Sequence, residues 1–385
     1  MQKYTDTSEM FFNETICKFL FASVQELFMT RLIAFYLPQY HPIPENDEWW
    51  GKGFTEWRNV AKAKPLFPGH YQPHLPADFG YYDLRVPETR AEQAIMAREY
   101  GIEAFCYYHY WFTGRRVLER PFNDILQSGE PDFPFCLCWA NENWTRTWNG
   151  SDKHILLEQK YSHEDDLNHI KSLVPALRDQ RYFRINGKPL LLIYRTEVLP
   201  DPAKTAEIWR TEAHKSGLGD LYLVRVESFK SGIDPQSIGF DAALEFAPDW
   251  RNMGAFKNRS RWQERLANFG MIPKVYFEQM IVEYPDLVSK MLAKPDAPYP
   301  RFHCVTPGFD NSARRKTEAA IFINSTPEFY ENWLKNILIR TSSKFEGDER
   351  IVFINAWNEW GEGNHLEPDM KWGRAYLEAT RRSLG

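Results

Sequence analysis

The sequence has few cysteines, no long apolar run and no large excess of basic charge. Only five of its 385 residues are cysteine, and four of those lie in apolar, strand-like runs. An odd number of buried thiols is typical of a reducing compartment rather than of a disulfide framework, so we expect a cytoplasmic protein. Cys136 and Cys138 are separated by one residue, which is too short a spacing for a zinc knuckle.

The absences also exclude a membrane span and a nucleic-acid partner. No apolar run approaches the about 20 residues that a membrane-spanning helix needs. The net charge is −5, the isoelectric point is near 6.1 and the basic residues form no stripe, which argues against binding of nucleic acid.

The first thirty residues differ from the rest of the chain. They lack the basic start and the small-residue cleavage site of a signal peptide. Met29 directly precedes the first clear strand. We therefore predict that residues 1–30 are a dispensable leader or an artefact of the assigned start, and that residues 31–385 form the domain. The alternative is a short helix packed on the outside of the domain.

Two nucleotide-binding signals are missing as well. No Gly-x-Gly-x-x-Gly follows the first strand, which argues against an open doubly wound sheet. The chain also has no Asp-x-Asp, which transferases that use a nucleotide sugar and a metal commonly carry. What the chain does have is 43% hydrophobic residues, enough for a sizeable core, and fourteen tryptophans, which fit a carbohydrate site.

Strands and helices alternate along the chain. Eight apolar, strand-like segments begin at residues 31, 103, 133, 189, 221, 241, 302 and 351. Helical patterns lie between most of them, at 87–100, 116–127, 163–179, 202–215, 285–292 and 327–339, and a last one covers 371–381. Such alternation gives a parallel sheet, and eight units predict a single α/β domain, a TIM-like (β/α)₈ barrel with long βα loops. An open doubly wound sheet is the alternative.

Polar side chains follow the ends of these strands. If the barrel closes, they converge on one rim, where barrels of this type carry their chemistry. His109 has the alternative of a core histidine, and Glu245, within an apolar run, would otherwise be a buried charge that needs a partner. The candidate ligands at the rim are Tyr36, His41, Tyr108, His109, Tyr194, Glu245, Asp310 and Asn358.

The stretch 351–368 is the most informative. An apolar strand turns abruptly polar and aromatic and carries Asn358, Glu359 and Glu362, with glycines at 361 and 363. One carboxyl of such a pair can protonate a leaving oxygen while the other removes a proton or attacks. Because aromatic faces suit sugar rings, the pair among tryptophans indicates carbohydrate chemistry. The alternative is that both glutamates lie on a solvated turn.

Four segments carry a family resemblance: FYLPQYHPIPENDEWWGKGFTEWRNV, YYHYWF, WANENWTRTW and NAWNEWGEGNHLEP. With them the chain resembles the glycoside hydrolase family 99-like proteins, also called WbsX-like, which are often associated with lipopolysaccharide or polysaccharide biosynthesis. The resemblance runs from about Arg31 to the C-terminus and implies a (β/α)₈ barrel.

The resemblance also implies roles for particular residues. Glu359 would deprotonate the 2-hydroxyl of a sugar, which then attacks its own anomeric carbon, and Glu362 would protonate the leaving oxygen. A general acid needs a raised pKa, which is expected for Glu362. No cofactor and no metal are implied. The side chains implied to line the sugar subsites are Trp139, Asn141, Glu142, Trp144 and Trp357.

Three functions follow as hypotheses, each with an oligosaccharide or polysaccharide as partner. The first is a retaining glycoside hydrolase on an α-linked glycan, with mannose-containing glycans among the candidates. The second is a glycosyltransferase in O-antigen or capsular polysaccharide biosynthesis. The third is a non-catalytic glycan-binding barrel.

Overall fold

The computed structural model describes residues 30–146, 151–253, 256 and 261–385. Its centre is a closed ring of eight parallel strands in the order β1-β14-β12-β10-β9-β8-β4-β2, with β2 pairing back onto β1. This ring confirms the predicted (β/α)₈ barrel, and each strand begins within two residues of its predicted start. The strands are β1 (Arg31–Tyr36), β2 (Ile102–Phe112), β4 (Phe135–Trp139), β8 (Lys188–Ile193), β9 (Tyr222–Val226), β10 (Ala242–Leu244), β12 (Arg301–Val305) and β14 (Ile351–Ile354).

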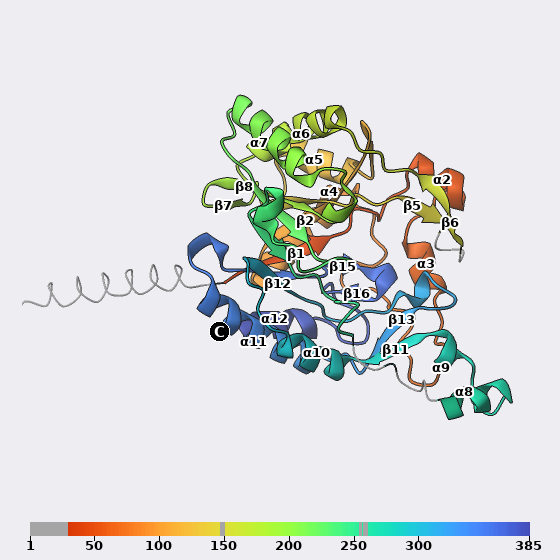
Figure 1. Cartoon of the computed structure of the whole chain (residues 1–385). Coiled ribbons are helices and arrows are strands. Elements are labelled where there is room, and N and C mark those ends of the chain that lie inside the picture. The colour runs from red at the N-terminus through yellow and green to blue at the C-terminus, as the bar shows by residue number, and fades with distance from the viewer. Residues whose placement is uncertain (1–29, 147–150, 254–255, 257–260) are drawn as a thin grey trace, which may run out of the picture.

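Helices surround the barrel (Figure 1). Proline lies in the first turn of most of them, where its missing N–H is not needed. Ser162, Asp201 and Thr326 each accept a hydrogen bond from the first helical turn and so fix a start. The helices are α4 (Pro87–Glu99), α5 (Arg120–Ser128), α6 (His163–Arg178), α7 (Pro202–Lys215), α10 (Tyr284–Ala293), α11 (Pro327–Lys344) and α12 (Ala375–Leu384).

The loops hold further elements that the sequence pattern did not predict. Strand β3 (Arg115–Val117) pairs with β2 and takes the first residues of the helix predicted at 116–127. Strands β11 (Met280–Glu283) and β13 (Ala320–Ile323) pair in parallel outside the barrel. The others are α2 (Pro44–Trp50), α3 (Trp57–Lys62), β5 (Trp144–Arg146), β6 (Ser151–Leu157), β7 (Arg184–Ile185), α8 (Arg261–Asn268), α9 (Val275–Glu278), β15 (Asn358–Glu359), β16 (Asn364–His365) and short 3₁₀ turns.

Aromatic rings fill the upper part of the barrel interior. The Phe35 ring stacks on Tyr108 at 5.3 Å between centroids and contacts Phe246 and Phe353 at 5.6 and 5.8 Å. These four residues come from β1, β2, the segment after β10, and β14. Because Tyr108 and Phe246 also line the cleft described below, this cluster forms its floor.

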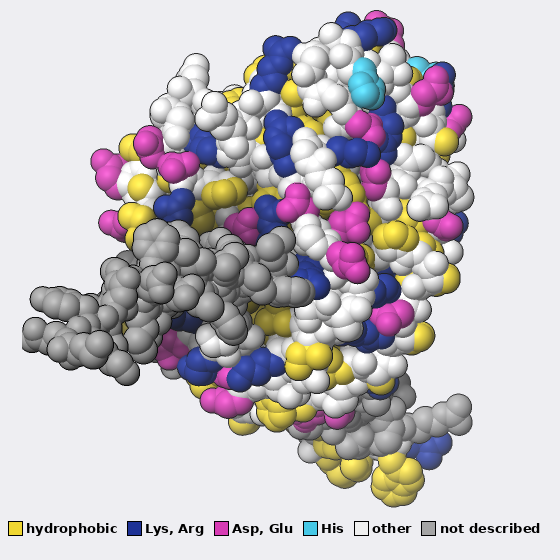
Figure 2. Space-filling model, turned by 90° about the vertical axis from the view of Figure 1, so that its left-hand side faces the viewer, with side chains coloured by type: hydrophobic (Ala, Val, Ile, Leu, Met, Phe, Trp, Pro, Cys, Tyr) yellow, Lys and Arg dark blue, Asp and Glu magenta, His cyan; other side chains and the backbone are white. Residues whose placement is uncertain are grey.

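Several loop elements gather on one side of the barrel, and the face turned away from them carries charges of both signs. Helices α2 and α3 and strands β5 and β6 lie on the right of Figure 1. On the face turned to the viewer in Figure 2, acidic and basic side chains are interspersed. Across the described ranges, no helix has the length and apolar character needed to cross a membrane.

The predictions for the leader and for the cysteines have different outcomes. The leader predicted at 1–30 lies almost wholly outside the described residues, as does Cys17. The other four cysteines, Cys106, Cys136, Cys138 and Cys304, are buried free thiols, as the apolar runs around them predicted.

Candidate active site

A short hairpin after β14 carries the two glutamates. It consists of β15, a 3₁₀ turn (Trp360–Glu362) and β16. Asn358 fixes the hairpin to the end of β1, because its side chain accepts from Leu37 N at 2.7 Å and donates to Leu37 O at 3.1 Å. Gly361 allows a close approach, since a methyl group there would lie 2.7 Å from Arg314 Nε. The stretch 358–365 is therefore a tightly packed turn and not a solvated one.

One guanidinium group holds both glutamates. Arg314 Nη1 lies 2.6 Å from Glu362 Oε1, and Nη2 lies 3.1 Å from Glu359 Oε2. Its Nε lies 3.1 Å from Glu56 Oε1, a carboxylate from the loop between α2 and α3. The side chain of Glu56 is fully buried, that of Glu359 is 9% exposed and that of Glu362 is 27% exposed. Glu362 is thus the member most open to the cleft.

The site contains three carboxyl groups and one basic group, the Arg314 guanidinium. The pKa of Glu359 is raised to about 8, chiefly by burial. The positive charge of Arg314 lowers this pKa, and the negative charges of Glu362 and Glu56 raise it further. The pKa of Glu362 is also raised, again first by burial, in the direction expected for a general acid. Because Glu359 and Glu362 are buried beside each other and both pKa values are raised, this pair holds a proton more readily than free carboxyls do.

The glutamates open onto a cleft of about 400 Å³. Six of the predicted site residues line it, and its other walls are largely aromatic. The predicted residues in the lining are Tyr108, Glu142, Trp144, Tyr194, Glu359 and Glu362, and the additional aromatic residues are Trp49, Trp50, Tyr110, Phe229, Phe246, Trp250 and Phe309. A cleft of this size with aromatic walls and a few polar groups suits a small ligand.

Three of the predicted ligands lie beneath the cleft instead. Tyr36, Trp357 and Asn358 are fully buried. The Tyr36 hydroxyl donates to Gln93 Oε1 at 2.6 Å, and the Trp357 ring packs 5.1 Å from that of Phe105. They support the hairpin and the barrel floor and do not line the cleft.

Four more predicted ligands do not line the cleft. His109 Nε2 lies 3.0 Å from His169 Nε2 on α6, and Trp139 packs against the same His169. His109 is therefore the buried core histidine of the alternative reading. His41 is buried, and Asn141 bonds with the backbone of Arg195 through both ends of its amide.

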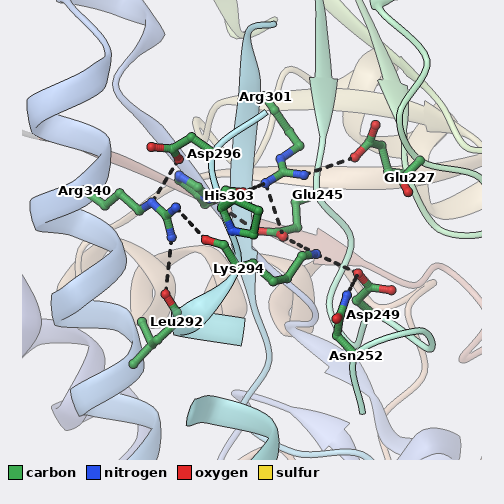
Figure 3. A network of polar contacts seen from close by, with 12 residues as sticks. Glu227, Glu245, Asp249, Asn252, Leu292, Lys294, Asp296, Arg301, His303 and Arg340 are labelled. Carbon is green, nitrogen blue, oxygen red and sulfur yellow. Dashed lines mark hydrogen bonds and ion pairs between the residues drawn. The ribbon is translucent and has the colours of Figure 1, made fainter. Parts of the chain in front are cut away.

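Glu245 belongs to a buried ion-pair network and does not line the cleft (Figure 3). Its carboxylate contacts the Lys294 ammonium, lies 3.2 Å from His303 Nδ1 and lies 3.8 Å from the Arg301 guanidinium. Lys294 Nζ is also 2.6 Å from Asp249. These partners hold the pKa of Glu245 at about 2 against the effect of burial. The buried charge at Glu245 thus has structural partners.

Asp310 also acts from behind the cleft. Its Oδ2 accepts from His70 Nε2 at 2.6 Å and from Gln72 Nε2 at 2.9 Å. Its backbone N–H donates to the Glu362 carbonyl at 2.5 Å. Asp310 therefore fixes the backbone that carries Glu362 without reaching the cleft itself.

Arg314 is the residue that the sequence reasoning missed. It follows the 3₁₀ turn Asn311–Ala313, in a loop without the apolar-to-polar change that marked the other candidates. A buried arginine must find carboxylates, but no spacing in the sequence indicates which ones. Glu56, Trp49 and Trp50 lie in the long connection after β1, and long structured loops in compact domains are usually functional.

Two curated proteins are similar to this chain over most of its length. Two proteins from Xanthomonas campestris pv. campestris, strains ATCC 33913 and B100, both described as uncharacterized protein WxcX, are each 44% identical over 362 residues. Each match covers 94% of this chain, and the chain spans about half the length of these relatives.

Solved structures are similar in fold at low identity. A glycoside hydrolase-like protein superposes with a TM-score of 0.54 at 15% identity, covering 92% of this chain and 94% of that one. A GH99 endo-alpha-mannosidase from Bacteroides thetaiotaomicron superposes with a TM-score of 0.53 at 14% identity, covering 92% and 96%.

The family model of glycosyltransferase WbsX matches residues 32–380, which include the barrel strands, apart from Arg31 at the start of β1, and the hairpin with both glutamates. This chain belongs to the glycosyltransferase WbsX family.

Proposed function

We propose that this chain is a carbohydrate-active enzyme that cleaves an α-linked glycan with retention of anomeric configuration. The observation that carries the proposal is the pair Glu359 and Glu362, which share one guanidinium at an aromatic cleft and together retain a proton. Acid–base cleavage of a glycosidic bond needs one protonated and one ionised group within reach of one sugar.

In the proposed first step, Glu359 takes the proton of the sugar 2-hydroxyl as its oxygen attacks C1. The bond between C1 and the leaving oxygen breaks, and Glu362 donates its proton to that oxygen. The product of this step is a 1,2-anhydro sugar. In the second step, Glu362 takes a proton from water, whose oxygen attacks C1; the bond between C1 and the 2-oxygen breaks, and Glu359 returns its proton to the 2-oxygen. The family resemblance supplies this assignment of roles.

Arg314 must respond to substrate in this scheme. In the free protein its shortest contact is with Glu362, at 2.6 Å, and this contact favours an ionised Glu362 and a protonated Glu359. Donation by Glu362 requires the proton to move between the two carboxyls. A sugar hydroxyl that competes for the Arg314 guanidinium would release Glu362 and permit that transfer.

The test uses aryl α-mannosides and oligosaccharides released from the polysaccharide of the source organism, with and without nucleotide sugars. We expect nucleotide-independent cleavage with a retained anomer, observed by NMR. The variants Glu359→Gln and Glu362→Gln should each lower kcat/KM by at least about 10²-fold. Glu197→Gln serves as the matched control, because Glu197 pairs with Arg195 and does not line the cleft.

Two refinements separate the roles. A substrate with a good aryl leaving group needs little protonation, so it should restore the first step, release of the aryl group, in Glu362→Gln and not in Glu359→Gln. The second step of Glu362→Gln should stay slow, because Glu362 is also the base toward water. A 2-deoxy or 2-O-methyl substrate should not turn over at all, because it lacks the internal nucleophile. Turnover of such a substrate, or an inverted product, would refute the mechanism.

Glycosyl transfer is the second candidate, and the description of the family favours it. The same carboxyl pair could pass the sugar of the 1,2-anhydro intermediate to a hydroxyl acceptor in place of water. A product that forms only when a nucleotide sugar is added would establish transfer from that donor. Glycan binding that is unchanged in Glu362→Gln, together with no turnover under any condition, would instead indicate a binding protein.

A further inference from the structure

A second cavity of about 320 Å³ lies behind the hairpin. Phe309 lines both this cavity and the cleft, so the segment 309–310 separates the two. Three potential metal ligands, His74, His365 and Asp369, line the second cavity. Neither the acid–base pair nor the proposed reaction uses any of them.

The ligand atoms of these three residues already face one another. His74 Nδ1 lies 2.9 Å from His365 Nε2, and His365 Nε2 lies 4.0 Å from Asp369 Oδ2. All three atoms fall within 4.8 Å of one another. Ligands of a tetrahedral zinc ion with bonds of about 2.0–2.1 Å lie about 3.3 Å apart. The separations of 2.9 and 4.0 Å bracket this spacing.

In two of these residues, the polar atom that does not face the other ligands forms hydrogen bonds with the backbone. His365 Nδ1 donates to the Glu367 carbonyl at 2.9 Å, which leaves the lone pair of Nε2 directed at His74. Asp369 Oδ1 accepts from the N–H groups of Lys371 and Trp372 at 3.0 and 2.6 Å, and the Tyr71 hydroxyl also interacts with this carboxylate. Oδ2 is the oxygen that faces His365 Nε2. Such second contacts orient the ligands in metal sites of proteins.

The backbone of the hairpin permits the approach. Gly363 has φ +54°, and a Cβ at that position would lie 3.2 Å from His74 Cε1 and 3.1 Å from Asp310 Cβ. Only glycine combines this conformation with this clearance. His74 comes from the loop before α4, and His365 and Asp369 lie four residues apart in β16 and the turn after it, so an ion bound here would join two segments that are distant in sequence.

We propose that His74 Nδ1, His365 Nε2 and Asp369 Oδ2 bind one divalent transition-metal ion of the Zn²⁺ type. Two imidazoles and one carboxylate suit such an ion better than Mg²⁺ or Ca²⁺, which prefer oxygen ligands. The carboxylate of Asp310 and that of Asp369 offset the Lys371 ammonium, which lines the same cavity. The fourth coordination position would face the cavity.

The proposed role of this ion is structural. His365 ends the hairpin that carries Glu359 and Glu362, so the ion would fix the far end of that hairpin to the rest of the domain. The proposal does not depend on glycosidase activity, because binding and stability measure it without any substrate.

The full chain, stripped with a chelator, is titrated with Zn²⁺ by calorimetry and with Co²⁺ by visible absorption. We expect one equivalent to bind, the spectrum of a nitrogen- and oxygen-ligated Co²⁺, and a melting temperature that rises with metal concentration. Asp369→Asn keeps the acceptor for the two N–H groups and removes the anionic ligand, so the dissociation constant should increase at least about 10–100-fold. His74→Asn should have the same effect.

His163→Gln is the matched control, because His163 is exposed and outside the cluster; it should bind as the wild type does. Far-UV circular dichroism identifies any variant that fails to fold. If His74→Asn does not fold, the dissociation constant of Asp369→Asn alone tests the proposal. Absence of saturable binding to the folded wild type would overturn the proposal. So would equal binding by Asp369→Asn, or a thiolate-to-cobalt charge-transfer band that assigns the ion to a cysteine.

Discussion

Replacing Arg314 by methionine should destabilise the protein by an amount that grows with pH. The substitution removes the charge and keeps most of the side-chain volume. Three carboxyls then share a buried site without the guanidinium that contacts each of them. Removing one partner of a buried ion pair costs about 3–5 kcal/mol when the remaining charge cannot escape.

The sign of the pH dependence follows from the pKa of Glu359, which is raised from 4.5 to about 8 in the folded protein. A carboxyl with a raised pKa holds its proton more tightly when folded, so its contribution to stability is fully present below pH 4.5 and is lost as pH rises through 8. For Glu359 this loss is on the order of 4–5 kcal/mol across that window. Without Arg314 the pKa rises further, so the loss is larger.

The measurement is the free energy of unfolding from denaturant titrations at pH 5 and pH 8, followed by far-UV circular dichroism. For Arg314→Met we expect a cost of about 1 kcal/mol at pH 5, where lost hydrogen bonds dominate, and about 3–5 kcal/mol at pH 8. Arg58→Met is the matched control, since Arg58 donates to the backbone carbonyls of Trp50 and Lys52. Its cost should not depend on pH.

An equal cost for Arg314→Met at both pH values would refute the reasoning. It would mean that packing of the side chain, and not its charge, stabilises the site. The retained proton inferred for Glu359 and Glu362 would then lose its electrostatic basis.

Three further predictions follow from other parts of the structure. Lys294→Met should lower the free energy of unfolding at pH 7 by about 3–5 kcal/mol, because it removes a cationic partner of the buried Glu245 carboxylate. The pKa of Glu245 is lowered to about 2, so this cost should shrink as pH falls from 4.5 towards 2. Gly361→Ala should displace Arg314, which would lie 2.7 Å from the new methyl group, and should abolish turnover even where the variant stays folded by circular dichroism. Trp144→Ala should weaken oligosaccharide binding by about 1–2 kcal/mol in calorimetry while leaving the melting temperature nearly unchanged, because the ring lines the cleft and is only partly buried.

The residues of the candidate site were predictable to different degrees. Glu359 and Glu362 stood out because an apolar strand turns polar and aromatic at that point, and a parallel barrel presents strand ends at one rim. Tyr108, Trp144 and Tyr194 lie in the cleft for the same reason. Each of these residues is near a strand end, and local sequence is enough to find it.

Other residues near strand ends do not line the cleft, and sequence could not separate them from those that do. Successive side chains of a strand point to opposite faces, so His109 turns towards α6 while Tyr108 turns into the barrel. Glu245 faces Lys294, which lies 49 positions later in the chain. Which way a side chain points depends on register and on neighbours that are distant in sequence.

The amino-acid pattern by itself determined the eight-stranded barrel, because apolar runs alternate with helical segments in one consistent order. It also determined that acidic and aromatic groups meet at one rim. Only the tertiary structure decided that Arg314 joins Glu56, Glu359 and Glu362, because this contact spans 258 positions between Arg314 and Glu56. Long-range electrostatic partners are selected by packing in three dimensions, and no periodicity in the chain encodes them.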